Sequence, residues 1–262
     1  MKMKQYVIDA FTDQVFHGNQ AAVCLLDHWL VDEILHQMAR ENNFSDTAFV
    51  VKEAGQWHLR WFTPAGEIEL CGHATLGTAY VLFKFVETTA TQLTFNTLAG
   101  ELTVTKDGDW LAMDFPKYAL TPVPVTAAMS EALGVTPTAA YLGRDLVCIF
   151  DTVAQVQTMT PDIPKVKALP GVLVHVTAPG QDEFDYVARS FAPKHLIDED
   201  PVCGVGHCHL VPYWTQRLGK NQLMAYQASE RGGVLKVKMN GERVSLAGQV
   251  ALYSVGDVMV EG

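Results

Sequence analysis

Basic residues are scarce in this sequence of 262 residues. Lys and Arg number 19 against 29 Asp and Glu, so the formal net charge is −10 and the isoelectric point about 5.3. No window is dense in Lys or Arg, which argues against a nucleic-acid groove and against binding to an anionic membrane surface. We therefore expect neither nucleic acid nor a membrane as a partner, although local backbone dipoles can still bind a small anion.

Long apolar runs are also missing. No stretch approaches the roughly 18 unbroken apolar residues of a membrane span, and the opening "MKMKQYVIDAFTDQ" turns polar before an apolar core of signal-peptide length. Cysteines are few and odd in number: Cys24, Cys71, Cys148, Cys203 and Cys208. These features predict a cytoplasmic protein with free thiols.

Apolar residues make up 48% of the chain and charged residues 18%, which excludes disorder and allows a proper core. The length suits two modest domains or one large one. Cys24 in "AAVCLL" and Cys148 in "DLVCIF" lie within such apolar runs, so we expect both to be small buried residues in strands.

Each half of the chain shows the same order of elements. The spacing of apolar residues predicts helices over 31–43, 72–86, 126–134 and 205–218. Strands are expected in 5–11, 20–26, 47–51, 57–64, 145–150, 172–179 and 184–193, and β-meanders over 92–116 and 222–255. Asp107-Gly108 and Asn240-Gly241 are typical of hairpin turns.

A finer repeat accompanies this order. Arg60–Pro64, "RWFTP", precedes Cys71-Gly72, and Arg189–Pro193, "RSFAP", precedes Cys203-Gly204. The offsets are 189 − 60 = 129 and 203 − 71 = 132 residues. A shared R-x-F-x-P, a Cys-Gly, a helix and a meander indicate a duplicated half. We expect halves at 1–117 and 118–262, and allow the last strand to cross back to the first half.

A Cys-Gly pair at a helix start is suited to chemistry on a small acid. The first backbone N–H groups of a helix lack partners within it and carry partial positive charge, so a carboxylate or an enolate binds there. Glycine lets a ligand approach the backbone, and the same field lowers the pKa of a thiol. Two such helix starts facing one substrate would exchange protons with it on either side.

Three segments, "NFSDTAFV", "ELCGHATLGTAYVLF" and "DEDPVCGVGHCHLVPYW", resemble the phenazine-biosynthesis PhzF-like family. That family shares the fold of diaminopimelate epimerase and, more loosely, of proline racemase. The likeness covers most of the chain, including the opening "VIDAFTDQVFHGNQAAV". It implies an α/β (α+β) fold of two pseudo-symmetric halves, each a β-barrel-like sheet around a central helix, with the active site in the cleft between them and a homodimer as the assembly.

The resemblance also implies site residues. Asp46 stands where PhzF-like enzymes carry an acid/base glutamate, and its side chain is shorter by one methylene, about 1.5 Å of reach. Gly72 and His73 match the segment that contacts substrate, and Asp200 matches the aspartate of the E-D-P motif.

The second helix start departs from the family pattern at two positions. Gly204 matches the turn that supplies backbone donors, but Val205 replaces the hydroxyl residue that many members carry after it. Cys203 stands where many have threonine, which makes the chain more like the two-thiol epimerases.

Three functions remain open from the sequence. The first is a cofactor-independent PhzF-like isomerase, in which Asp46 moves a proton on carbon of a small carboxylate-bearing substrate. The second is an amino-acid racemase or epimerase that uses Cys71 and Cys203 as thiolate base and thiol acid. The third is a catalytically degenerate binding protein. Asp46 in place of glutamate and Val205 in place of a hydroxyl residue support this alternative.

Other chemistries find less support. Cys203, His207, Cys208 and His209 form a dense cluster, but a structural zinc site wants four convergent ligands and no second pair is evident. A cysteine hydrolase would need a base against one thiol, which nothing in the sequence places there. "GVGHC" carries only part of a dinucleotide fingerprint and follows an acidic loop. We expect no metal and no cofactor.

Overall fold

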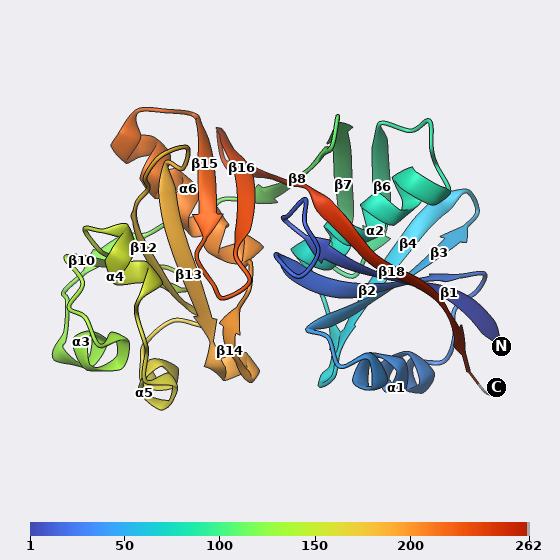
Figure 1. Ribbon diagram of the computed structural model, residues 1–262, viewed down its shortest axis with the longest axis horizontal. Helices are drawn as coiled ribbons and strands as arrows, with labels where there is room; N and C mark the ends of the chain where they lie inside the picture. The colour runs from blue at the N-terminus through green and yellow to red at the C-terminus, as the bar shows by residue number, and fades with distance from the viewer. Residues whose placement is uncertain (261–262) are drawn as a thin grey trace. The chain divides into compact units, whose positions relative to one another are not determined.

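The computed structural model describes residues 1–260 as two compact units (Figure 1). Unit 1 comprises Met1–Asp114 with Ala247–Gly262, and unit 2 comprises Phe115–Leu246. Strand β18 (Val250–Met259) pairs antiparallel with β1 (Lys2–Ala10), which ties the C-terminal segment to unit 1. Across residues 1–260, none of the helices has the length and apolar character that a membrane span needs.

Unit 1 is a curved sheet with one helix on each face. Its further strands are β2 (Asn19–Leu26), β3 (Asp46–Glu53), β4 (Gln56–Thr63), β5 (Gly66–Ile68), β6 (Gln92–Thr97), β7 (Gly100–Asp107) and β8 (Trp110–Pro116). Helix α1 (Asp32–Asn42) packs on β3 and β4, and helix α2 (Gly72–Phe85) packs on β1, β2 and β3 (Figure 1). Side chains alternate along a strand, so Cys24 faces α1 while Val23 faces α2.

Helix α2 is buried along most of its length, which explains its nearly continuous apolar sequence. Gly77 lies where α2 crosses β1, and a Cβ there would come within 2.5 Å of the Ile8 side chain. The glycine therefore allows the helix to approach the sheet closely.

Unit 2 contains strands β9 (Thr121–Val123), β10 (Ala139–Leu142), β11 (Leu146–Ile149), β12 (Val174–Pro179), β13 (Tyr186–Ala192), β14 (Ile197–Asp200), β15 (Gln222–Gln227), β16 (Gly233–Asn240) and β17 (Arg243–Gly248). Its helices are α3 (Ala127–Leu133), α4 (Val153–Gln157), α5 (Ile163–Ala168), the 3-10 turn η1 (Pro193–His195) and α6 (Gly204–Leu218). Cys148 is fully buried in β11, as Cys24 is in β2, which confirms the expectation for both.

The two units repeat one order of strand pairing. In unit 1 the pairs β1–β2, β2–β3, β3–β4, β4–β6 and β6–β7 are antiparallel, parallel, antiparallel, parallel and antiparallel. In unit 2 the pairs β10–β11, β11–β12, β12–β13, β13–β15 and β15–β16 follow the same alternation. This internal agreement supports the duplication inferred from the repeated sequence motif.

The repeated arginine forms the same ion pair in each unit. Arg60 Nε and Nη2 donate to the Glu67 carboxylate at 2.6 and 2.7 Å, and Arg189 Nε and Nη2 donate to Glu199 at 2.8 and 2.7 Å. Each glutamate precedes its Cys-Gly by four residues (71 − 67 and 203 − 199). We call these two contacts the Arg–Glu clamps, because each joins a long strand to the short strand before a helix start.

The unit 2 clamp provides the first prediction. Arg189 also donates through Nη1 to the carbonyls of Val156 and Met159, at 3.1 and 2.7 Å, and its side chain is only 11% exposed. Arg189→Met leaves Glu199 and both carbonyls unpaired, so we expect a loss of about 3 kcal/mol in the free energy of unfolding. Urea denaturation measures it.

The matched control is Lys117→Met, which breaks the exposed 2.7 Å pair with Glu242. We expect this substitution to cost less than about 1 kcal/mol. Equal losses in the two variants would show that the clamp does not stabilise unit 2.

Candidate functional site

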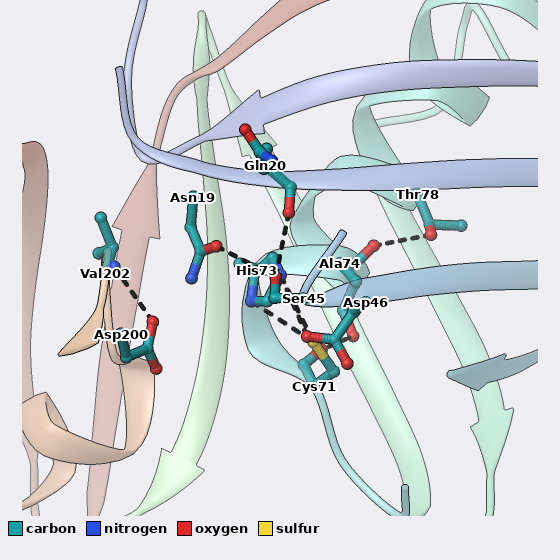
Figure 2. Close-up of polar contacts among 11 residues, drawn as sticks. Asn19, Gln20, Ser45, Asp46, Cys71, His73, Ala74, Thr78, Asp200 and Val202 are labelled. Atoms are coloured by element: carbon teal, nitrogen blue, oxygen red, sulfur yellow. Dashed lines mark hydrogen bonds and ion pairs between the residues drawn. The ribbon is translucent and has the colours of Figure 1, made fainter. Parts of the chain in front are cut away.

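In unit 1 a polar cluster forms where β3 begins beside the start of α2 (Figure 2). His73 Nε2 lies 3.3 Å from Asp46 Oδ2 and 3.2 Å from Ser45 Oγ. Asp46 and His73 are 6% and 9% exposed, respectively, and Cys71 is 6% exposed. The structure thus brings three of the residues predicted from sequence, Asp46, Cys71 and His73, into one buried group, with Gly72 in the same turn.

The Cys71 thiol lies beside the imidazole. Its Sγ is 3.5 Å from His73 Nδ1 and 4.0 Å from Nε2. Because the two distances are so similar, the sulfur is not on the lone-pair axis of either nitrogen. The sequence offered no base near a cysteine, and the structure supplies one; the geometry nevertheless pairs His73 more directly with Asp46 than with Cys71.

Burial governs the charge of His73. It lowers the pKa of the ring from 6.5 to about 4, against the opposing effect of a backbone hydrogen bond with Gln20. The imidazole is therefore neutral at pH 7. A neutral ring facing a carboxyl group allows one proton to lie on either side of the contact, which suits acid–base exchange.

In unit 2 the other predicted residues gather at the start of α6. Asp200 ends β14 and accepts a hydrogen bond from the Val202 N–H at 3.2 Å. Cys203 immediately precedes the helix and is 3% exposed, while Gly204 and Val205 form its first residues and are half-buried.

The environment of Cys203 disfavours a thiolate. Burial raises its pKa well above 9.0, and Asp200 raises it further by its charge and by a hydrogen bond. The Gly206 N–H opposes these effects with a hydrogen bond that lowers the pKa. A buried, protonated thiol is a poor base at neutral pH.

Sequence reasoning missed three contributors to these groups: Ser45, Gln20 and Gly206. Ser45 stands directly before Asp46 in "FSDTAFV", which is the one local signal for it. Gln20 and Gly206 act through backbone groups. Their side chains therefore give no indication in the sequence that these residues belong to the site.

Among residues 1–260, two groups of side chains have ligand atoms close enough to hold a metal ion: Asp46, Cys71 and His73 in unit 1, and Asp145, His175 and His209 in unit 2. Neither is the four-residue cluster considered from the sequence. His207 of that cluster pairs instead with the Tyr186 hydroxyl at 2.7 Å and with Gln227 at 3.1 Å, which gives it a structural role.

The unit 2 group has a feature that disfavours a cation. Arg144 Nη1 already contacts Asp145 Oδ2 at 3.1 Å, so a positive charge is in place there.

Comparison with known proteins identifies the family. Residues 8–256 match the model of the phenazine biosynthesis-like protein family, PhzC-PhzF, and the chain belongs to this family. An uncharacterized isomerase of Pseudomonas aeruginosa is 45% identical over 256 residues, covering 98% of each chain. A PhzF-family crystal structure from Enterococcus faecalis matches with a TM-score of 0.97 at 44% identity, over 99% of this chain and 100% of that one.

A more distant likeness concerns the fold alone. A hydroxyproline epimerase from Agrobacterium vitis gives a TM-score of 0.60 at 11% identity, over 98% of this chain and 92% of that one. These matches confirm the predicted family and the α/β fold shared with epimerases. The family match and the similar proteins named as isomerases identify this chain as an isomerase.

The lowered pKa of His73 predicts how stability depends on pH. Between pH 6.5 and about 4 the unfolded ring binds a proton that the folded ring does not, so stability falls as the pH falls through this window. His73→Gln should make that fall less steep, as measured by urea denaturation at pH 7, 6 and 5. The remaining slope comes from His207 and His209, whose pKa values burial lowers to about 3 and about 4. An identical slope in the variant would contradict the assignment.

Proposed function

We propose that the protein is a cofactor-independent isomerase that moves a proton on carbon of a small carboxylate-bearing substrate, with Asp46 as the acid/base. The buried contact between Asp46 and His73 is the observation that carries this proposal. A carboxyl group held by a neutral imidazole can take a proton and return it without a charged partner beside it. Ser45 Oγ also lies 3.2 Å from the same ring nitrogen.

The start of helix α2 is the proposed position for the substrate carboxylate. Backbone N–H groups at a helix start favour an anion, and no acidic residue stands in the first turn of α2. Gly72 exposes the backbone there to a ligand. His73, in the same turn, would then hold Asp46 next to the carbon beside the bound carboxylate.

The shorter side chain at position 46 bears on this proposal. Asp46 begins β3, which runs parallel to β2, and the end of its carboxyl group reaches His73 across the strand start. Asp46 reaches His73 although its side chain is one methylene shorter than that of glutamate. The substrate would therefore lie nearer to the backbone of β3 than a glutamate would require.

The second candidate is the two-thiol racemase that uses Cys71 and Cys203. Its support is the repeated Cys-Gly at the start of each buried helix. The raised pKa of Cys203 argues against it, because a thiolate base has to form at neutral pH. We therefore rank proton transfer by Asp46 first.

Deuterium exchange separates the candidates. The protein is incubated in deuterated water with a panel of amino acids, hydroxy acids and unsaturated cyclic carboxylic acids, and label at carbon is followed by mass spectrometry. We expect Asp46→Asn to lower the rate by about 100-fold or more, because the carboxyl that exchanges the proton is gone. Asp46→Glu should retain part of the rate, and the double variant Cys71→Ser/Cys203→Ser should stay within about tenfold of the wild type.

The opposite pattern would replace the proposal with the racemase. Loss of exchange in the double thiol variant with retention in Asp46→Asn would assign the proton transfer to the cysteines. No label in any compound with the wild type would count against proton transfer to carbon.

A further inference from the structure

A second buried polar chain lies wholly within unit 2. His175 Nε2 is 3.1 Å from Asp145 Oδ2, and His175 Nδ1 is 2.9 Å from Ser190 Oγ. Asp145 and His175 are completely buried and Ser190 is 1% exposed. A carboxylate only accepts hydrogen bonds, so Nε2 donates to Asp145; in a neutral ring Nδ1 then accepts from the Ser190 hydroxyl.

These three residue types also form nucleophilic triads, but the surroundings exclude that use. A Cβ on Gly206 would lie 3.0 Å from Ser190 Oγ and 2.9 Å from His175 Nδ1. The first turn of α6 therefore rests directly on the hydrogen bond between Ser190 and His175. A substrate carbonyl has no room to reach the serine oxygen.

Asp145, at the other end of this series of hydrogen bonds, is held by contacts that do not involve α6. The Leu173 N–H donates to Asp145 Oδ1 at 3.1 Å, and Arg144 donates to Oδ2 at 3.1 Å. Burial alone would raise the pKa of Asp145, but the hydrogen bond from His175 and the positive charge of Arg144 lower it overall. Asp145 is thus an anchored carboxylate that orients His175.

Helix α6 also approaches Asp145 through His209, which stands one turn after Val205 in the same helix. His209 Nδ1 lies 3.1 Å from the Val205 carbonyl and 3.7 Å from Asp145 Oδ2. Since a carbonyl only accepts, His209 donates through Nδ1, so one side chain contacts both the first turn of α6 and the anchored carboxylate.

This support reaches both predicted site residues of unit 2. Gly206 donates its N–H to Cys203, and Ser190 stands opposite Asp200 in the ladder of β13 and β14. A shift of the Ser190–Gly206 contact would therefore move the cysteine and the aspartate together.

We propose that Asp145, His175 and Ser190 are positioning residues that fix Cys203 and Asp200 at the start of α6. Their effect on turnover rests on the proposed function, whereas their effect on the geometry around Cys203 does not. The test uses both readouts, so that failure of one is distinguishable from failure of the other.

The first readout is the alkylation of Cys203 by iodoacetamide in the folded protein at pH 8, followed by peptide mass spectrometry. Cys148 serves as the internal reference, because it is fully buried and burial raises its pKa to about 12. Ser190→Ala releases the turn and opens Cys203 to solvent, so we expect Cys203 to react about fivefold faster or more, relative to Cys148. Gly206→Ala, which presses on the chain from the opposite side, should give the same change.

The second readout is the deuterium exchange described above, in which Ser190→Ala should lower the rate by about tenfold, because Asp200 moves together with Cys203. The matched control is Thr177→Val, two residues along β12 from His175. Thr177 is equally buried, and its hydroxyl bonds the Val187 carbonyl and Trp214. We expect this control to lower stability without changing the relative reactivity of Cys203.

Two results would overturn the positioning role. One is an unchanged reactivity of Cys203 in both Ser190→Ala and Gly206→Ala. The other is an equal increase in the relative reactivity of Cys203 in Thr177→Val. That result would show that Asp145, His175 and Ser190 contribute only to the general stability of the core. Absence of any isomerase activity would remove only the second readout and would count against the proposed function instead.

Discussion

The two Arg–Glu clamps fix where the helices that carry the site residues begin. Each holds a short strand against a long one four residues before a Cys-Gly, so the helix that follows begins at a fixed place on its sheet. Bidentate pairing fixes direction as well as distance. The clamp therefore explains why the same arginine recurs at Arg60 and Arg189 and why a buried helix start recurs after it.

Burial at these helix starts then determines the chemistry. In unit 1 it keeps His73 neutral and places it against the Asp46 carboxyl, which is the arrangement that the proposed proton transfer uses. In unit 2 burial raises the pKa of Cys203, and a separate polar chain supports the turn beneath it. One repeated scaffold thus presents an acid–base pair in one unit and a protonated thiol in the other.

Features that are local in sequence could be predicted, and contacts between distant residues could not. The helix expected over 72–86 spans Gly72–Phe85, and the Asn240-Gly241 turn has the positive φ at Gly241 that a hairpin of this kind uses. Helices α4 and α5 were missed because five or six residues are too few to show a helical period. The glutamates of the clamps and the contact of Ser45 with His73, 28 residues apart, depend on the folded sheet.

The central claim is that a neutral His73 lies in direct contact with the Asp46 carboxyl, with Nε2 3.3 Å from Oδ2. Nitrogen-15 NMR of the imidazole at pH 6 measures it most directly, because neutral and protonated rings have different nitrogen shifts. We predict a neutral His73 whose Nε2 resonance moves in Asp46→Asn, with little change at His207. A doubly protonated His73 at pH 6, or an Nε2 resonance indifferent to Asp46→Asn, would contradict the account.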